Sequence, residues 1–282
     1  MTTYAVTGAT GHFGQAAIKA LHSLLRPGDA LIALARNLQK AQKLAPSDVP
    51  VRLGDYDDVT SLTQSLAGID KLLFVSSQPG QAVSRADQHQ NVVNAAKAAD
   101  VKFIAYTSFP QAPTNPASLA ADHKATEAMI EASGIAHSFL RNNWYLENES
   151  STLKAGANGK DFVYAAGDGK AGWALEREYA EAAARVMTLT DPKAIYEFAG
   201  TPRTYADLAA AIPGEFHVKP VSDADYLAGL KQVGLPQPVA ELITSFQTLI
   251  REGGLQPTSD DLTQVLGHPL TPLADAIQEV LA

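Results

Sequence analysis

The sequence predicts an α/β fold built on a doubly wound parallel sheet, followed by a smaller and mostly helical C-terminal lobe. Two observations carry this prediction. Short apolar strand patterns alternate with helical patterns through the first half of the chain, and two of the predicted strands, L-L-F-V and F-I-A-Y, are apolar on both faces. Strand–helix alternation is typical of parallel sheets, and continuously apolar strands are typical of sheets that helices cover on both sides.

Six predicted strands define the sheet: Tyr4–Thr7, Ala30–Ala35, Val51–Leu53, Lys71–Val75, Lys102–Thr107 and His137–Arg141. The helical patterns between them are Gln15–Leu24, a segment that ends at Lys43, Val59–Leu66, Ala86–Ala99 and Ala120–Ala132. Right-handed crossovers place the carboxyl ends of parallel strands at one edge of the sheet. We therefore expect the residues that follow these strands to line a single cleft: Gly8, Arg36, Asp55, Ser76, Ser108 and Asn142.

The pattern changes after Asn148, where two glycine-rich segments flank a short F-V-Y-A strand. Helix starts then follow closely, because Thr204, Ser222 and Thr258 each precede an aspartate by three positions and Thr271 precedes a proline. We predict one domain over residues 1–150 and a smaller, mostly helical lobe over 151–282, with part of 176–200 returning to the sheet.

The segment Tyr4–Gly14, Y-A-V-T-G-A-T-G-H-F-G, predicts a dinucleotide site in the first domain. Gly8 permits a tight strand-to-helix turn, Gly11 lets the backbone approach a pyrophosphate, and Gly14 allows close packing of helix on sheet. The pyrophosphate would bind the N–H groups at the start of the following helix. An ordinary turn is the alternative, but a strand precedes the glycines and a helix and a second strand follow them, which favours the dinucleotide.

Arg36 follows the second strand, at the position where an NAD-specific site usually has an acidic residue that binds the ribose 2′-hydroxyl. Positions 34–37 contain no Asp or Glu. An arginine there suits a 2′-phosphate, so we predict NADPH as the cofactor. The alternative is a solvated arginine at a strand end.

Other polar residues follow the later strands. Asp55 could bind the adenine amino group or cap the next helix. Ser76, Ser77, Tyr106 and Ser108 place hydroxyls where the ribose and nicotinamide would lie, although such a serine can equally close a loop. His123 lies on the helix after the fifth strand, where a catalytic or orienting role competes with that of an exposed or locally satisfied histidine.

Amide and aromatic side chains gather at the end of the sixth strand, in L-R-N-N-W-Y-L-E-N. Asn143, Trp144 and Tyr145 could stack an aromatic substrate. The two aromatic residues could instead fill the interface between the lobes, and the two roles are compatible.

Composition excludes several classes of protein. The net charge is −8 and no Lys/Arg cluster stands out, which argues against nucleic-acid and anionic-membrane partners. The absence of cysteine excludes disulfides and thiolate chemistry and fits a reducing cytoplasm. No signal peptide is recognised and no apolar run approaches the ~20 residues of a membrane span. The scattered histidines give no support for a metal site.

Taken together, these stretches resemble the NmrA-like branch of the atypical short-chain dehydrogenases, which have a Rossmann fold. The resemblance is narrower still to the NADPH-dependent quinone oxidoreductase type 2 and triphenylmethane reductase group. The matching text includes V-T-G-A-T-G-H-F-G, A-R-N, G-D-Y-D, K-L-L-F-V-S-S, A-Y-T-S, H-K-A-T-E, L-R-N-N-W-Y and the closing L-G-H-P.

The resemblance implies roles for individual residues. The pyrophosphate would contact Gly8, Thr10, Gly11, His12 and Phe13. Arg36 would bind the 2′-phosphate and Ser76 would lie at the ribose, while Asn143, Trp144 and Tyr145 would face the nicotinamide and the substrate.

The Tyr-x-x-x-Lys proton donor of better-known relatives is absent, since Leu119 and His123 occupy the aligned positions. This favours an acceptor that needs little acid catalysis, such as a quinone or a similar electron-poor aromatic molecule. The main alternative is a non-enzymatic redox sensor that binds NADP(H), and an isomerase with tightly bound NAD is a third. The oligomeric state is open, with a homodimer as one candidate.

Overall fold

The computed structural model describes residues 1–78 and 82–282, which form two compact units. Unit 1 comprises Met1–Asn142, Glu176–Phe198 and Asp261–His268. Unit 2 comprises Asn143–Leu175, Ala199–Asp260 and Pro269–Ala282. The chain therefore leaves unit 1 after its first 142 residues and returns to it twice.

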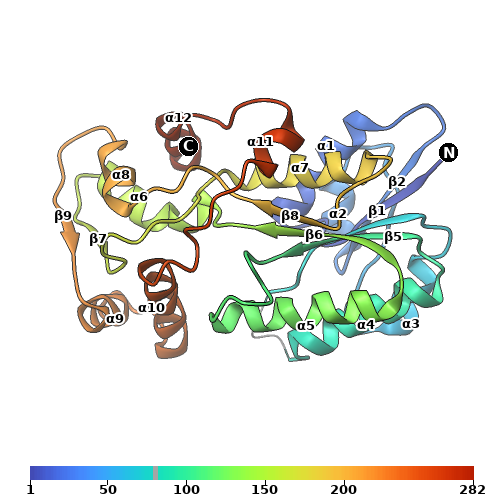
Figure 1. The fold of residues 1–282 in the computed structure, drawn as a ribbon, viewed down its shortest axis with the longest axis horizontal. Helices are drawn as coiled ribbons and strands as arrows, with labels where there is room; N and C mark the ends of the chain where they lie inside the picture. The colour runs from blue at the N-terminus through green and yellow to red at the C-terminus, as the bar shows by residue number, and fades with distance from the viewer. Residues whose placement is uncertain (79–81) are drawn as a thin grey trace. The chain divides into compact units, whose positions relative to one another are not determined.

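Unit 1 is built on a seven-stranded parallel sheet with the order β3-β2-β1-β4-β5-β6-β8 (Figure 1). The strands are β1 (Thr3–Val6), β2 (Ala30–Ala35), β3 (Val51–Leu53), β4 (Lys71–Phe74), β5 (Phe103–Ser108), β6 (Ala136–Asn142) and β8 (Ile195–Phe198). The predicted parallel sheet is confirmed. The six predicted strands all occur, with ends that differ by at most one residue.

Helices cover both faces of this sheet. They are α1 (His12–Leu24), α2 (Leu38–Leu44), α3 (Val59–Ser65), α4 (Arg85–Ala98), α5 (Ser118–Ser133), α7 (Glu176–Thr188) and α11 (Asp261–Leu266). α1 packs against α7 on one face, and α4 packs against α3 and α5 on the other (Figure 1). α1 begins at His12, earlier than the predicted Gln15, because Gly11 already has the extended backbone of an N-cap.

The core of unit 1 fills the space between the central strands and the α3–α4–α5 layer. Its buried side chains include Leu34, Leu72, Phe74, Ile104 and Phe139, each at most 1% exposed. Burying one such side chain contributes about 1.5–3 kcal/mol. This packing holds the central strands of the sheet against the α3–α4–α5 layer.

Unit 2 is mostly helical, as predicted for the C-terminal lobe. It contains η1 (Leu146–Glu149), α6 (Ser150–Ala157), α8 (Tyr205–Ala210), α9 (Asp223–Gln232), α10 (Gln237–Arg251), α12 (Leu273–Leu281) and a two-stranded parallel sheet of β7 (Phe162–Tyr164) and β9 (Val218–Pro220). The F-V-Y-A strand is therefore confirmed. α6 was not predicted, because its glycine suggested a loop. A Cβ at Gly156 would lie 3.3 Å from atoms of Ile212, Phe162 and Phe216, so glycine permits close packing there.

Two of the predicted helix caps are confirmed and two are wrong. Thr204 forms a capping box with its partner aspartate, and Ser222 caps α9. Thr258 is not a cap, because α11 begins at Asp261, whose carboxylate instead accepts hydrogen bonds from Lys193 Nζ and the Glu197 N–H. At α12 the N-cap is Pro272 rather than Thr271, one residue later than predicted.

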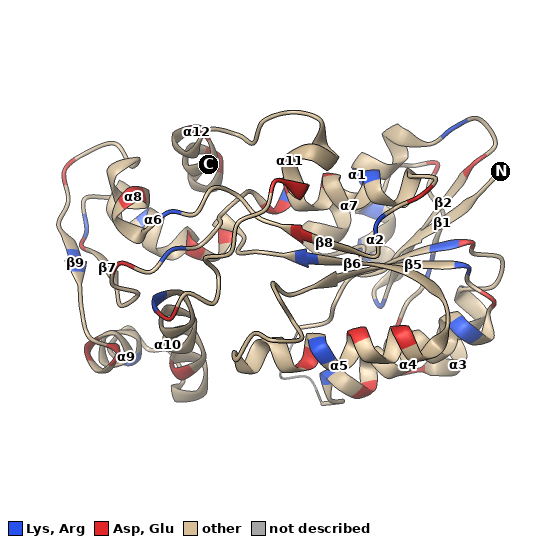
Figure 2. Ribbon diagram, in the orientation of Figure 1, with Lys and Arg blue, Asp and Glu red and all other residues tan. Residues whose placement is uncertain are grey.

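Charged residues of both signs are interspersed along the ribbons of each unit (Figure 2). Within the described ranges no helix is long and apolar enough to cross a membrane. Across the same residues there is no group of three or more His, Asp or Glu side chains that could hold a metal ion.

Candidate active site

The glycine segment forms the turn between β1 and α1. Gly8 has φ +65°, a backbone conformation that favours glycine, and a Cβ at Gly14 would overlap the Gly8 carbonyl oxygen. A Cβ at Gly11 would meet only that carbonyl oxygen, at 3.4 Å. Gly8 and Gly14 are thus required by the fold itself, whereas Gly11 leaves open space beside the backbone.

The start of α1 suits an anion. Gly11 and His12 are exposed, Thr10 is half-buried and Phe13 is buried. The first turn contains no acidic residue, and no side chain caps it. Unshielded N–H groups and the positive end of the helix dipole favour a phosphate at such a position. These residues fit the pyrophosphate of a dinucleotide.

Arg36 follows β2 at the same edge of the sheet. Its side chain is exposed and makes no hydrogen bond or ion pair with any residue that the structure describes. The neighbouring Asn37 is occupied locally, because its side chain caps α2 by accepting from the Lys40 N–H at 2.9 Å. The guanidinium therefore remains available to a ligand.

Asp55 does not cap the helix that follows it. α3 is capped by Asp58, which accepts from the Ser61 N–H at 3.0 Å, so that alternative is wrong. The carboxylate of Asp55 instead accepts from the Asp57 N–H at 3.2 Å. Adenine recognition by Asp55 stays a prediction.

The loop after β4 is tied to its neighbours by backbone N–H groups. The Ser76 N–H donates to Thr107 Oγ1 at 2.8 Å, and the Ser77 N–H donates to His89 Nε2 at 3.0 Å. The Val75 N–H donates to Thr7 Oγ1 at 2.9 Å. Side chains of β5 and α4 thus hold the half-buried serines at the carboxyl edge.

Tyr106 and His123 lie inside unit 1. Tyr106 is fully buried, and its hydroxyl lies 2.9 Å from His123 Nδ1, while Arg85 Nη2 lies 3.1 Å from His123 Nε2. Burial, together with the positive charge of Arg85, lowers the pKa of His123 well below its ordinary value, and burial raises the pKa of Tyr106. The histidine is neutral and the tyrosine is protonated at neutral pH. This interior position disfavours direct substrate contact, although their catalytic roles stay predictions.

Ser108 belongs to a buried ionic network that joins four elements, β5, α5, β6 and β8. Its hydroxyl donates to Glu127 Oε1 at 2.6 Å, and Glu127 accepts two further bonds from Arg141 on β6 at 2.9 and 2.7 Å. Arg141 also donates to Glu197 on β8 at 2.9 Å. Figure 2 shows a basic segment on β6 beside an acidic segment on β8. Burial raises the pKa of Glu197. The network fixes the ends of β5, β6 and β8.

The amide and aromatic segment begins unit 2. Asn143 is occupied by main-chain groups, since Nδ2 donates to the Leu255 carbonyl at 3.1 Å and Oδ1 accepts from the Gly172 N–H at 3.2 Å. Trp144 is 6% exposed, and its indole N–H donates to Glu149 Oε1 at 3.0 Å. Tyr145 is half-buried and precedes η1. The segment is rigidly held, and its contact with a substrate stays a prediction.

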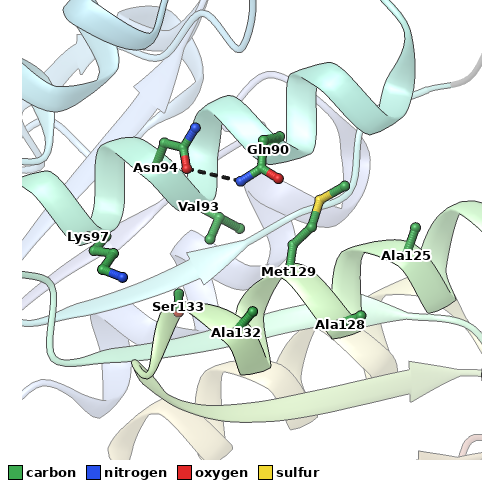
Figure 3. Close-up of a pocket in the computed structure, with 9 residues that line it drawn as sticks. All are labelled: Gln90, Val93, Asn94, Lys97, Ala125, Ala128, Met129, Ala132 and Ser133. Carbon is green, nitrogen blue, oxygen red and sulfur yellow. Dashed lines mark hydrogen bonds between the residues drawn. The ribbon is translucent and has the colours of Figure 1, made fainter.

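A groove of about 370 Å³ runs between α4 and α5 (Figure 3). It is lined by Gln90, Val93, Asn94 and Lys97 of α4 and by Ala125, Ala128, Met129, Ala132 and Ser133 of α5. These residues extend toward the carboxyl ends of the two helices. That direction leads away from the carboxyl edge of the sheet, so the groove is separate from the candidate site.

Four side chains that support the site were missed by sequence reasoning: Arg85, His89, Thr126 and Glu149. Only Thr126 carried a signal, because it belongs to the H-K-A-T-E motif. The other three lie in helices and belong to none of the sequence motifs named above.

Comparison with known proteins agrees with this geometry. Residues 8–171 match a family model described as NAD(P)H-binding. The chain belongs to this NAD(P)H-binding family. It is 42% identical to quinone oxidoreductase 2 of Escherichia coli over 98% of both chains. The crystal structure of that quinone oxidoreductase with NADPH has a TM-score of 0.92 and covers 99% of this chain and 100% of its own.

Two further proteins are similar to this chain over nearly its whole length. The structure of Citrobacter sp. triphenylmethane reductase with NADP(H) is 35% identical, with a TM-score of 0.92 over 99% of this chain and 100% of its own. An NmrA-like family domain-containing oxidoreductase from Aspergillus flavus is 26% identical over 99% of this chain and 94% of its own. The resemblance to the NmrA-like branch and to its quinone and triphenylmethane reductases is confirmed.

Proposed function

We propose that this protein is an NADPH-dependent reductase that transfers a hydride to a quinone or a similar electron-poor aromatic acceptor. The observation that carries the proposal is the pairing of the open glycine turn at Gly11 with the unpaired Arg36 at the same sheet edge. Whole-length similarity to a quinone oxidoreductase supports the choice of acceptor.

Each group of residues has one task in this proposal. The Gly8–Gly14 turn and the start of α1 bind the pyrophosphate, and Arg36 binds the 2′-phosphate. Ser76, Ser77 and Ser108 border the ribose and nicotinamide, while Asp55 lies toward the adenine. When bound, NADPH supplies the hydride from C4 of its nicotinamide, so that NADPH, quinone and a proton give NADP⁺ and hydroquinone.

The chain's own contribution to the chemistry is mainly orientation. His123 is neutral and bound on both ring nitrogens, and Tyr106 is buried, so neither offers a ready proton. A quinone can be reduced without a ready proton donor from the protein, because the oxyanion that develops on it is weakly basic. Asn143, Trp144 and Tyr145 are proposed to contact the acceptor, whose correct placement accounts for most of the rate enhancement.

Steady-state oxidation of NADPH with a panel of quinones, aldehydes and dyes tests the function, with NADH as the control. We expect turnover with quinones and a strong preference for NADPH. Tight NADPH binding without turnover of any acceptor would instead favour the redox-sensor alternative. A cytoplasmic location, where NADPH is regenerated, and a homodimer are further parts of the proposal that fractionation and size-exclusion chromatography test.

A further inference from the structure

His89 is a fully buried imidazole that links the cofactor loop to α5. It is 0% exposed, and its ring lies edge-on to Phe74 with centroids 5.0 Å apart. Nε2 accepts from the Ser77 N–H at 3.0 Å and lies 3.2 Å from the Ser77 hydroxyl. On the other side of the ring, Nδ1 lies 2.8 Å from Thr126 Oγ1. The ring thus bridges the loop after β4 and the helix that carries the H-K-A-T-E motif.

The protonation state of this ring is fixed by its surroundings. Burial and the positive charge of Arg85 lower the pKa of His89 to about 3, so the ring is neutral at neutral pH. A neutral imidazole has one N–H and one acceptor nitrogen. The Ser77 N–H can only donate, so Nε2 must be the acceptor and Nδ1 must carry the proton.

Thr126 completes this assignment because it can accept that proton. Its hydroxyl donates to the Asp122 carbonyl at 2.7 Å, which leaves the lone pairs of Oγ1 for the His89 Nδ1–H and for the Tyr106 hydroxyl. The donor and the acceptor of each Thr126 hydrogen bond are then assigned. Without the threonine oxygen, the Nδ1–H would be left with a long contact to the Tyr106 hydroxyl at 3.5 Å, and a poorly bonded buried donor is unfavourable.

We propose that Thr126 and His89 are positioning residues for the cofactor: Thr126 holds His89 in its Nδ1–H tautomer, and this tautomer holds the Ser77 loop at the nicotinamide end of the site. The inference rests on the proposed function, because it takes Ser77 as a cofactor neighbour. Neither residue contacts the reacting atoms. The T of H-K-A-T-E thereby acts on the cofactor through an imidazole on a different helix.

Thr126→Val is the informative change, because it keeps the shape of the side chain and removes the acceptor. The His89 proton would then move toward Nε2, where it opposes the Ser77 N–H and releases the loop. We expect the Kd of NADPH to rise about tenfold, the effect of one poorly bonded buried donor. Thr126→Ser should restore the value.

Thr244→Val is the matched control. Thr244 is also a buried helical threonine, and its hydroxyl donates to the Ala240 carbonyl four residues earlier at 2.8 Å, just as Thr126 donates to Asp122. It contacts no histidine among the described residues. Its change should leave the Kd of NADPH unaltered, even if the stability falls equally.

A double-mutant cycle tests whether Thr126 acts on NADPH binding through His89. In His89→Gln the amide oxygen can accept from the Ser77 N–H without any tautomer, so adding Thr126→Val should cause no further loss of NADPH affinity.

Ring nitrogen chemical shifts of ¹⁵N-histidine in the cofactor-free protein give a readout that is independent of binding. They should show Nδ1 protonated in the unsubstituted protein and a shift toward Nε2–H in Thr126→Val.

Three outcomes would overturn the inference: an Nε2–H tautomer in the unsubstituted protein, equal effects of Thr126→Val and Thr244→Val on the Kd of NADPH, or a full Thr126→Val effect in the His89→Gln background. If the unsubstituted protein fails to bind NADPH, the proposed function falls and the cofactor role of His89 falls with it. The tautomer measurement still distinguishes that result from a wrong assignment of the ring.

Discussion

Arg141 and Glu127 form a buried two-point ion pair, in which Nε lies 2.9 Å from Oε1 and Nη2 lies 2.7 Å from Oε2. The pair joins β6 to α5, and so brings the L-R-N-N-W-Y and H-K-A-T-E segments into contact. Glu127 also receives the Ser108 hydroxyl. Glu127 of α5 therefore binds the carboxyl ends of two strands, β5 and β6.

Removing one partner of this pair should destabilise the fold strongly. We expect Glu127→Ala to lower the free energy of unfolding by about 3–5 kcal/mol, because among the described residues it leaves the buried guanidinium with Glu197 alone as a counterion. Urea unfolding measures this. Glu131→Ala, at an exposed position of the same helix, is the control and should change stability by less than about 0.5 kcal/mol. Equal effects of the two changes would contradict a structural role for the pair.

Arg36 should determine the preference for NADPH over NADH. A charge-assisted contact to phosphate contributes roughly 1.5–3 kcal/mol, so Arg36→Ala should weaken NADPH binding on the order of ten- to a hundredfold and leave NADH binding unchanged. Titration of both cofactors measures the effect. Arg26→Ala, another exposed arginine of unit 1, should alter neither affinity. Equal NADPH and NADH affinities in the unsubstituted protein would disprove the prediction.

Gly11 and Gly14 should respond differently to the same substitution. Gly11→Val should fold normally, because its Cβ has room, but should lose NADPH binding through overlap with the pyrophosphate. Gly14→Val should fail to fold, because its Cβ would overlap the Gly8 carbonyl oxygen. Circular dichroism and cofactor titration separate the two cases. Unchanged NADPH affinity in a folded Gly11→Val protein would mean that the glycine serves only the turn.

The sequence predicts well those features that depend on short segments. Apolar strands, the glycine turn and the unpaired Arg36 position all follow from residues close together in the chain. Helix starts also depend on distant contacts, as Thr258 illustrates: the helix begins at Asp261, two residues later than a Thr258 cap predicts, and Asp261 is bound by Lys193 and the Glu197 main chain.

Partners that are distant in the sequence could not be predicted. His89 meets Ser77 and Thr126 only because α4 and α5 pack side by side on the folded sheet. Tyr106 shows a related problem. β5 is buried on both faces, so its side-chain pattern does not reveal which residues point toward the interior and which toward the site.

Protonation of His89 should make the fold sensitive to acid. Its pKa is about 3 in the folded protein against 6.5 for an ordinary histidine, so below pH 6.5 the unfolded chain takes up a proton that the folded chain does not. This contribution to stability is complete above pH 6.5. It falls by about 1.4 kcal/mol per pH unit as the pH drops from 6.5 toward 3.

Urea unfolding between pH 7 and pH 4.5 measures this dependence. In His89→Gln the free energy of unfolding should depend less steeply on pH, because the variant lacks the one proton that His89 takes up on unfolding. His123, whose pKa is lowered chiefly by burial and by Arg85, remains in both proteins. Identical slopes for the two proteins would show that His89 titrates normally in the fold.

The final prediction concerns the rate of quinone reduction. If orientation dominates, Tyr106→Phe should lower kcat by less than about tenfold, whereas loss of a general acid would normally cost ~10²–10⁴. The buried hydroxyl of Tyr106, already bound to His123, gives the structural reason. His123→Ala should have an intermediate effect, because it removes a partner of both Tyr106 and Arg85.

Asn143→Ala and Trp144→Ala should be more harmful. Asn143 holds the main chain at Leu255 and Gly172, and Trp144 is fixed by Glu149, so either change would misplace the proposed acceptor surface. A displacement of about 1 Å can cost on the order of 10² in rate. Steady-state kinetics on the four variants gives the order of effects. A nearly inactive Tyr106→Phe enzyme beside an active Asn143→Ala enzyme would replace the orientation mechanism with one in which a buried tyrosine supplies the proton.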